Sequence, residues 1–144
     1  MFFDTHNHSQ FSFDGEGTTV EKSALAAVEK GFGGICFTDH CDFYVPKMKE
    51  EFEPIVCEVF DVDAQQAEID RVNGLATDGA FGKSASKKFK IFKGIELGLG
   101  EKNHEQTRAL LSKYRFDQNI ASVHYLEAVS YKHFRAHETG RNLV

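Results

Sequence analysis

Residues 1–14, MFFDTHNHSQFSFD, join a short apolar segment to a cluster of metal-binding side chains. The segment Met1 to Thr5 is typical of a short strand, and His6, His8 and Asp14 follow directly after it. On an extended segment, side chains at i and i+2 point the same way, so both imidazoles can reach one cation, and Asp14 lies far enough along the loop to fold back toward them. The stretch therefore predicts a metal site at the end of a strand.

The chain has 144 residues, of which 41% are hydrophobic and 14 are Phe, which predicts a single domain over residues 1–144 with a buried core. Its net charge of −5 and the lack of a basic cluster argue against extended nucleic acid as a partner. The three cysteines contain no C-x-x-C pair, and there is no basic segment followed by a long apolar run at the N-terminus. We therefore expect a cytoplasmic protein with reduced thiols and no membrane span.

A helix and a second strand follow the first loop. Thr18 and Glu21 form a T-x-x-E capping box that predicts a helix beginning at Thr18, and Gly31 is a candidate left-handed C-terminal cap. The next segment, Ile35 to Phe37, reads as a buried strand whose end delivers Asp39 and His40. This β-α-β order predicts parallel strands whose carboxyl ends gather on one face.

The rest of the chain continues the alternation of helices and strands. In chain order we expect a loop with short helical turns over 42–57, a helix over 58–76, a flexible connection over 77–88, a strand over 89–97, a helix over 103–114 that buries Leu110 and Leu111, and a strand over 119–123. The last two strands deliver Glu96 and His124 at their carboxyl ends.

Each expected strand therefore ends in a metal-binding side chain. In order along the chain these are His6 and His8, then His40, then Glu96, then His124. In a parallel β/α array such positions converge on one rim, and imidazole with carboxylate is the ligand mix of zinc, manganese and iron hydrolases. With Glu96 as a bridge, a site of two or three divalent metals would hold a water or hydroxide at lowered pKa and present it to an electrophile.

Simpler roles stand beside these. Asp14 could hydrogen-bond its own turn before Gly15, and Asp39 could equally be a helix or turn cap. Cys41, beside His40, is expected to pack rather than bind a metal. Phe11 and Phe13 are expected to belong to the core rather than to a substrate platform.

Four segments of the chain, DTHNHSQFSFDG, FTDH, KGIELG and ASVHYLE, resemble in order and spacing the first four motifs of the polymerase and histidinol phosphatase (PHP) superfamily, and the set looks most like its histidinol-phosphatase branch. The resemblance covers roughly the first 125 residues. It implies an α/β fold, a partial (β/α) barrel with about four of about seven parallel strands and a metal site at the strand carboxyl ends.

The resemblance also implies roles for single residues. It distributes the ligands over three metals: His6 and His8 for the first, Glu96 bridging the first and second, His124 for the second, and Asp14 and His40 for the third. Asp39 is implied to orient a neighbouring imidazole and, with Glu96, to serve catalysis. The cofactors would be two or three divalent ions of zinc, manganese or iron.

The implied activity is that of a metal-dependent phosphomonoester hydrolase resembling histidinol phosphatase, an enzyme of histidine biosynthesis. A hydroxide bridging two metals would attack the phosphorus of a small phosphorylated substrate in line. One alternative is a non-catalytic metal-binding or structural remnant of a truncated gene. A second alternative is a nuclease of the same superfamily, which the acidic charge and small size disfavour.

The chain also departs from the family pattern. Family members are longer and carry a further histidine and a late aspartate-x-histidine pair, whereas residues 126–144 read as a divergent tail. We therefore expect a domain truncated after the fourth motif, with part of its ligand set missing. Half a barrel would leave two open edges, which predicts a homo-oligomer whose partner covers them.

Overall fold

The computed structural model describes residues 2–43, 59–82, 89–99, 104–126 and 129–130. In chain order the elements are β1 (Phe3–Asn7), α1 (Val20–Glu29), β2 (Gly34–Phe37), β3 (His40–Cys41), α2 (Val62–Thr77), β4 (Lys90–Gly98), α3 (His104–Lys113), β5 (Gln118–Ser122), β6 (Tyr125–Leu126) and β7 (Val129–Ser130). No helix among these residues is long and apolar enough to cross a membrane.

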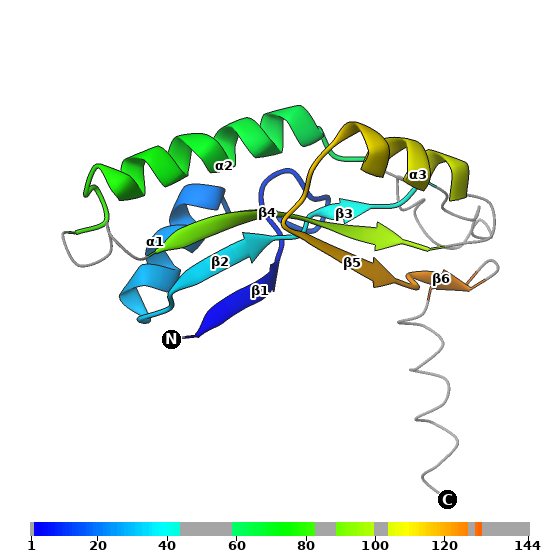
Figure 1. Cartoon of the computed structure of the whole chain (residues 1–144). Coiled ribbons are helices and arrows are strands. Elements are labelled where there is room, and N and C mark those ends of the chain that lie inside the picture. Colours follow the sequence, from blue (N-terminus) through cyan, green and yellow to red (C-terminus); the bar gives the residue numbers. More distant parts are fainter. Residues whose placement is uncertain (1, 44–58, 83–88, 100–103, 127–128, 131–144) are drawn as a thin grey trace, which may run out of the picture.

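A five-stranded parallel sheet organises the chain, with β4 at its centre. The first half of β4 pairs with β2, which pairs in turn with β1. The second half of β4 pairs with β3 on one side and with β5 on the other. All of these ladders are parallel, and in the described part of the chain the sheet stays open between β1 and β5. The fold is therefore the expected partial β/α barrel (Figure 1).

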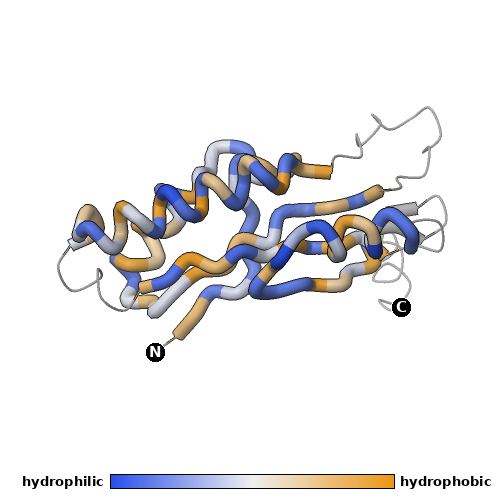
Figure 2. Tube along the Cα trace, turned by 45° about the horizontal axis from the view of Figure 1, so that its top comes forward, coloured by the Kyte–Doolittle hydropathy of each residue, from blue (hydrophilic) through white to orange (hydrophobic). Residues whose placement is uncertain are grey.

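The helices bury the apolar side of the sheet. Residues of α1 and α2 pack on β2 and β4 in one cluster: Val20, Ala24, Ala27, Ile35, Phe37, Ile69, Val72, Phe89 and Ile91. A second cluster forms around Ile95 and Leu97, further along β4, and the α3 residues Leu110 and Leu111 pack against it while only partly buried. Along α2, hydrophobic positions alternate with hydrophilic ones, as a helix lying on a sheet requires (Figure 2).

The start of α1 differs from the expected capping box. The N-cap is Thr19, whose extended backbone lets its hydroxyl accept the Lys22 N–H, at an N–O distance of 3.1 Å. Thr18 instead donates its hydroxyl to the Gly15 carbonyl. At the other end Gly31 has a φ of 78°, which confirms the left-handed cap.

Later boundaries differ by a few residues for identifiable reasons. The helix expected to begin at residue 58 begins at Val62 because Asp61 caps it, accepting the Ala64 N–H. The helix expected to bury Leu110 and Leu111 has no fully buried residue. Strand β4 runs on to Gly98, so Glu96 lies within the strand rather than at its end. The first residue of the helix expected over 103–114, most of the loop over 42–57, half of the connection over 77–88 and most of the tail over 126–144 fall outside the described residues.

Candidate metal centre

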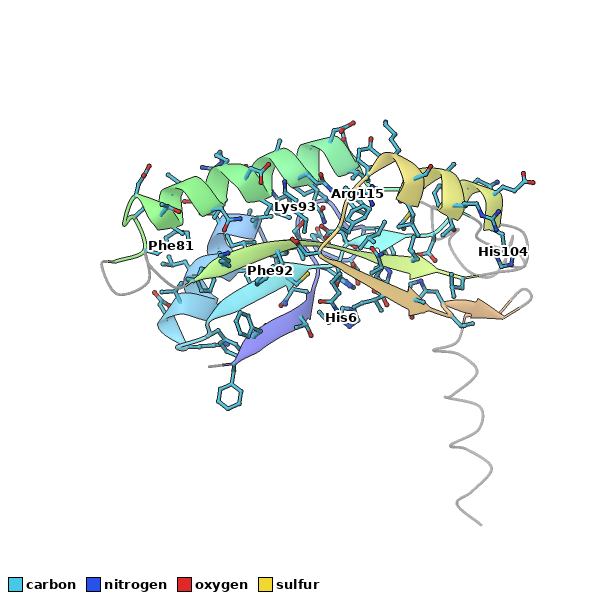
Figure 3. All side chains as sticks on the ribbon, viewed as in Figure 1. His6, Phe81, Phe92, Lys93, His104 and Arg115 are labelled. Carbon is cyan, nitrogen blue, oxygen red and sulfur yellow. The ribbon has the colours of Figure 1, made fainter. Side chains whose placement is uncertain are left out.

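The six ligands expected from the sequence come together at the carboxyl-terminal side of the parallel strands. His6 lies in β1, His40 in β3 and Glu96 in β4, while His8 and Asp14 come from the loop after β1 and His124 follows β5. Figure 3 shows His6 on the side of the sheet that faces away from α2. Their ligating atoms form three groups, each within 4.8 Å: His6, His8 and Glu96; His8, Asp14 and His40; and His40, Glu96 and His124.

Glu96 is the centre of the cluster. Its Oε2 lies 3.1 Å from the Nε2 atoms of both His6 and His8, and its Oε1 lies 3.0 Å from Nε2 of His124. The side chain is buried, which raises the pKa of a carboxyl, but hydrogen bonds from His124 and His8 outweigh burial and hold the Glu96 pKa well below its ordinary value. Glu96 therefore stays ionised and joins ligands from both ends of the sequence.

His8 and Asp14 form a pair within the loop after β1. The His8 Nδ1 lies 2.9 Å from both carboxylate oxygens of Asp14, and Ser12 donates its hydroxyl to the same carboxylate. Hydrogen bonding to Glu96, followed by Asp14, raises the pKa of His8 against the effect of burial. Burial of Asp14 opposes its ionisation, but the bonds from Ser12 and His8 lower its pKa overall. Asp14 thus faces the cluster and also hydrogen-bonds within its own turn.

His40 lies between the two acids. Its Nε2 is 3.4 Å from Oδ2 of Asp14 and its Nδ1 is 3.4 Å from Oε2 of Glu96. Burial lowers its pKa, so the ring is neutral at pH 7, the form that binds metals. Phe13 stacks on this ring with centroids 4.9 Å apart and is 46% exposed. The assignment of Phe13 to the core was therefore wrong.

Asp39 takes a different role from the one implied by the resemblance. Its fully buried carboxylate accepts hydrogen bonds from the backbone N–H and hydroxyl of Ser9 and from Nε2 of Gln65, the last at 2.6 Å. The carboxylate thus bonds the loop after β1 and helix α2 instead of an imidazole. In the structure Asp39 fastens the segment that carries His8.

Two residues of the site were not singled out in the sequence. Asp42 lies 2.8 Å from Nδ1 of His124 through its Oδ1, and it follows His40 at i+2, the same spacing that pointed to His6 and His8. Gln65 falls within the apolar stripe of α2, and a polar residue in such a stripe signals a buried partner. Both signals were present in the sequence.

His124 carries a positive charge near neutral pH when no metal is bound. Burial disfavours the imidazolium form, but the hydrogen bonds to Asp42 and Glu96 outweigh it and raise the pKa of His124 to about 9. Both ring nitrogens therefore face carboxylates. A metal that binds Nε2 has to displace a proton held there, so metal affinity at this group should rise with pH.

The donor set fits divalent metals. The Nε2 atoms of His6 and His8 lie 3.3 Å apart and face the same Glu96 oxygen, an arrangement in which a cation can replace shared protons. The Nδ1 of His40 is buried and makes no hydrogen bond. Imidazole nitrogens with carboxylate oxygens are the ligands that zinc, manganese and iron accept.

An open parallel α/β sheet with imidazoles and carboxylates gathered at the carboxyl-terminal side of its strands is the arrangement of a β/α-barrel protein with a candidate metal centre. The model of the PHP domain family matches residues 4–142 of this chain. The chain belongs to the PHP family.

Two curated relatives of the chain are both named as histidinol-phosphatases. The chain is 33% identical over 129 residues to a "Probable histidinol-phosphatase" of Clostridium acetobutylicum, covering 90% of this chain and 42% of that protein. It is 34% identical over 121 residues to the histidinol-phosphatase of Lactococcus lactis, covering 84% of this chain and 38% of that protein. The chain thus spans less than half the length of the curated relatives it matches.

A solved structure agrees in fold. The crystal structure of histidinol phosphate phosphatase from Lactococcus lactis, complexed with zinc, L-histidinol and phosphate, matches with a TM-score of 0.69 and 27% sequence identity. The match covers 90% of this chain and 42% of that one. The described sheet therefore has the same fold as part of this histidinol phosphate phosphatase.

Proposed function

We propose that this chain carries part of the metal centre of a phosphomonoester hydrolase that acts on a small phosphorylated alcohol, with histidinol phosphate as the first candidate. The observation that carries the proposal is the set of three overlapping ligand groups, two of which share Glu96. The structural relative that binds zinc, L-histidinol and phosphate supports the choice of substrate. Two or three zinc, manganese or iron ions would fill the groups.

Some side chains of the cluster would bind the metals, and others would hold those ligands in position. Bound divalent ions would supply Lewis acidity toward phosphoryl oxygens and an activated water. His6, His8 and His124 would hold them through Nε2, the atoms that face Glu96. Glu96 would neutralise the metal charge from its buried position.

The exposed face of Phe13 would border a substrate that is bound at the metals. Its ring stacks on His40 and is 46% exposed, so it adjoins the ligands without being covered by them. An aromatic surface of this kind suits an organic substrate group next to the phosphate. Asp39 would act indirectly, through the Ser9 contacts that fix the loop carrying His8.

A second candidate is a metal-binding chain without catalysis. It is favoured by the small number of protein ligands in each of the three groups found among the described residues. The three ligand groups offer three protein atoms each, and a metal held this way still needs further ligands from water, substrate or another chain. Metal binding and turnover must therefore be measured separately.

The experiment that tests the function combines metal analysis with assays on the purified chain. Zinc or manganese is titrated in, bound metal is counted, and release of inorganic phosphate is followed with p-nitrophenyl phosphate and with histidinol phosphate. Metal-dependent release that is abolished in Glu96→Gln supports the phosphatase, whereas stoichiometric metal without release supports the second candidate. Release of nucleotides from single-stranded DNA would instead point to a nuclease.

We also propose that a second copy of the chain covers the open edges of the sheet. Among the described strands β1 pairs with β2 alone, and Phe2 and Phe3 at this edge are 81% and 47% exposed. Unpaired edges with exposed apolar side chains favour association. Sedimentation equilibrium tests this, and a well-folded monomer at micromolar concentration would refute it.

A further inference from the structure

We propose that Asp42 is a positioning residue for His124, holding the ring so that Nε2 faces Glu96 and can bind a metal once its proton is displaced. The inference rests on the proposed metal centre and extends it to a carboxylate that the family motifs quoted above do not include. Asp42 follows β3, whereas His124 follows β5, so the pair ties together strands on opposite sides of β4.

The geometry around His124 defines one ring orientation. Its Nδ1 lies 2.8 Å from Oδ1 of Asp42, and its Nε2 lies 3.0 Å from Oε1 of Glu96. An ionised carboxylate only accepts hydrogen bonds, so Asp42 requires the proton of a neutral ring to be on Nδ1. The lone pair is then on Nε2, on the side of Glu96. Carboxylates that bond the outer nitrogen of a metal-bound histidine act in this way.

Asp42 is too well enclosed to be a surface carboxylate that meets His124 by chance. It is 5% exposed. Its Oδ2 is 3.7 Å from Nδ1 of His40, too far for a hydrogen bond, whereas its Oδ1 lies within hydrogen-bond distance of His124. Asp42 also belongs to none of the three ligand groups found among the described residues. Its place is behind a ligand, not among the ligands.

Gly98 at the end of β4 provides the space for this carboxylate. A Cβ atom at Gly98 would overlap Oδ1 of Asp42 and approach Nδ1 of His124 to 3.1 Å. Gly98 is also the register partner of Ser122, the last residue of β5. The glycine of the KGIELG segment thus leaves room for the contact between Asp42 and His124. This gives a second way to break the contact without changing Asp42.

Asp42→Asn tests the proposal with little change in shape. The amide can turn its NH₂ toward His124, which then moves the ring proton to Nε2 and blocks the metal-binding atom. We expect zinc affinity, measured by competition with a chelator, to fall about 10- to 100-fold. Asp63→Asn, which makes the same substitution at an exposed position of α2, is expected to bind zinc as the original chain does.

Nitrogen-15 NMR of the histidine rings supplies a readout that does not depend on activity or on metal. We expect the Nδ1–H of His124 to be protected from exchange in the original chain, with and without zinc, and to lose this protection in Asp42→Asn. Gly98→Ala should reproduce both the lower zinc affinity and the loss of exchange protection. The double variant should lose no more zinc affinity than either single variant, because both substitutions break the same contact. If Asp42→Asn does not fold, a folded Gly98→Ala chain still tests the proposal.

Three results would overturn the assignment. The first is unchanged zinc affinity in Asp42→Asn, and the second is an unprotected His124 Nδ1–H in the original chain. The third is loss of a whole zinc equivalent in Asp42→Asn while the His124 signal is unchanged, which would make Asp42 a direct ligand. A chain that binds no zinc would refute the proposed metal centre, but the NMR signal would still decide the role of Asp42.

Discussion

His40 and Glu96 are register partners across the parallel strands β3 and β4, and Nδ1 of the ring lies 3.4 Å from Oε2 of the carboxylate. The backbone ladder therefore determines which side chains meet in the site. Successive side chains of a strand point to opposite faces, so a slip of one residue in β4 would turn Glu96 toward the helices. The site depends on the register as much as on its ligands.

Glu96→Gln is expected to remove most metal binding. The amide keeps the shape of the side chain but loses the charge that faces His8 and His124, and its NH₂ cannot accept from an imidazole. Zinc affinity at pH 7.5 should fall at least about 100-fold, which is the largest loss typical of residues that only support a metal ligand. Competition with a chelator measures it, and Glu105→Gln on the exposed start of α3 is the control. Unchanged zinc stoichiometry would contradict the central role of Glu96.

Gln65→Leu is expected to destabilise the fold. The substitution leaves the buried Asp39 carboxylate without the 2.6 Å hydrogen bond from the Gln65 amide. Loss of such a bond costs about 1–3 kcal/mol in the free energy of unfolding. The matched control is Gln66→Leu, whose amide bonds an exposed backbone carbonyl, with an expected cost below about 1 kcal/mol. Urea unfolding measures both, and equal costs would argue against a special role for Gln65.

Gly94→Ala and Gly74→Ala are expected to act in opposite directions. A Cβ at Gly94 would come within 2.6 Å of Thr38 Cγ2 and 2.7 Å of the Phe37 carbonyl oxygen, which forces β2 and β4 apart. Overpacking of this kind costs about 1–3 kcal/mol. Gly74 lies in α2 with open space around its Cβ position, so alanine there should stabilise by about 0.5–1 kcal/mol. Thermal unfolding of both variants is the measurement.

Cys36 is expected to be inert to alkylation in the folded chain. Burial, with a smaller contribution from Asp117, raises the pKa of its thiol to about 12. At pH 8 iodoacetamide should modify Cys36 much more slowly in buffer than in urea, as mapped by mass spectrometry. Because the folded pKa is the higher one, the stabilising contribution is complete below about pH 8.5 and is lost as pH rises toward 12. Equal rates in buffer and urea would contradict this.

The sequence allowed the parallel sheet and the clustering of all six candidate ligands to be predicted. Both predictions rest on one physical rule: in parallel β/α units the strand carboxyl ends share a face, so His6, His40, Glu96 and His124 converge once the strands are located. The metals and the substrate are predictions that still await measurement.

The features that could not be predicted depend on which of two neighbouring residues makes a given contact. Thr18 and Thr19 are equally suited to cap α1, and only the path of the preceding loop selects Thr19. Asp39 lies beside His40 in sequence, but its side chain turns away from the cluster, toward Ser9 and Gln65. Phe13 is exposed because the turn that presents Asp14 also carries it outward over His40.

The parallel ladders described above also have a consequence for how the chain folds. No pairing within the five-stranded sheet can begin from a hairpin, because each strand reaches its partner only through a crossover or across intervening strands. The loops must therefore close, at a cost in chain entropy, before most of the stabilising contacts can form, which predicts slow folding. His124 joins Glu96 only after β5 has paired with β4. Metal capture by the group that includes His124 would thus be a late event that reports whether β5 has joined the sheet.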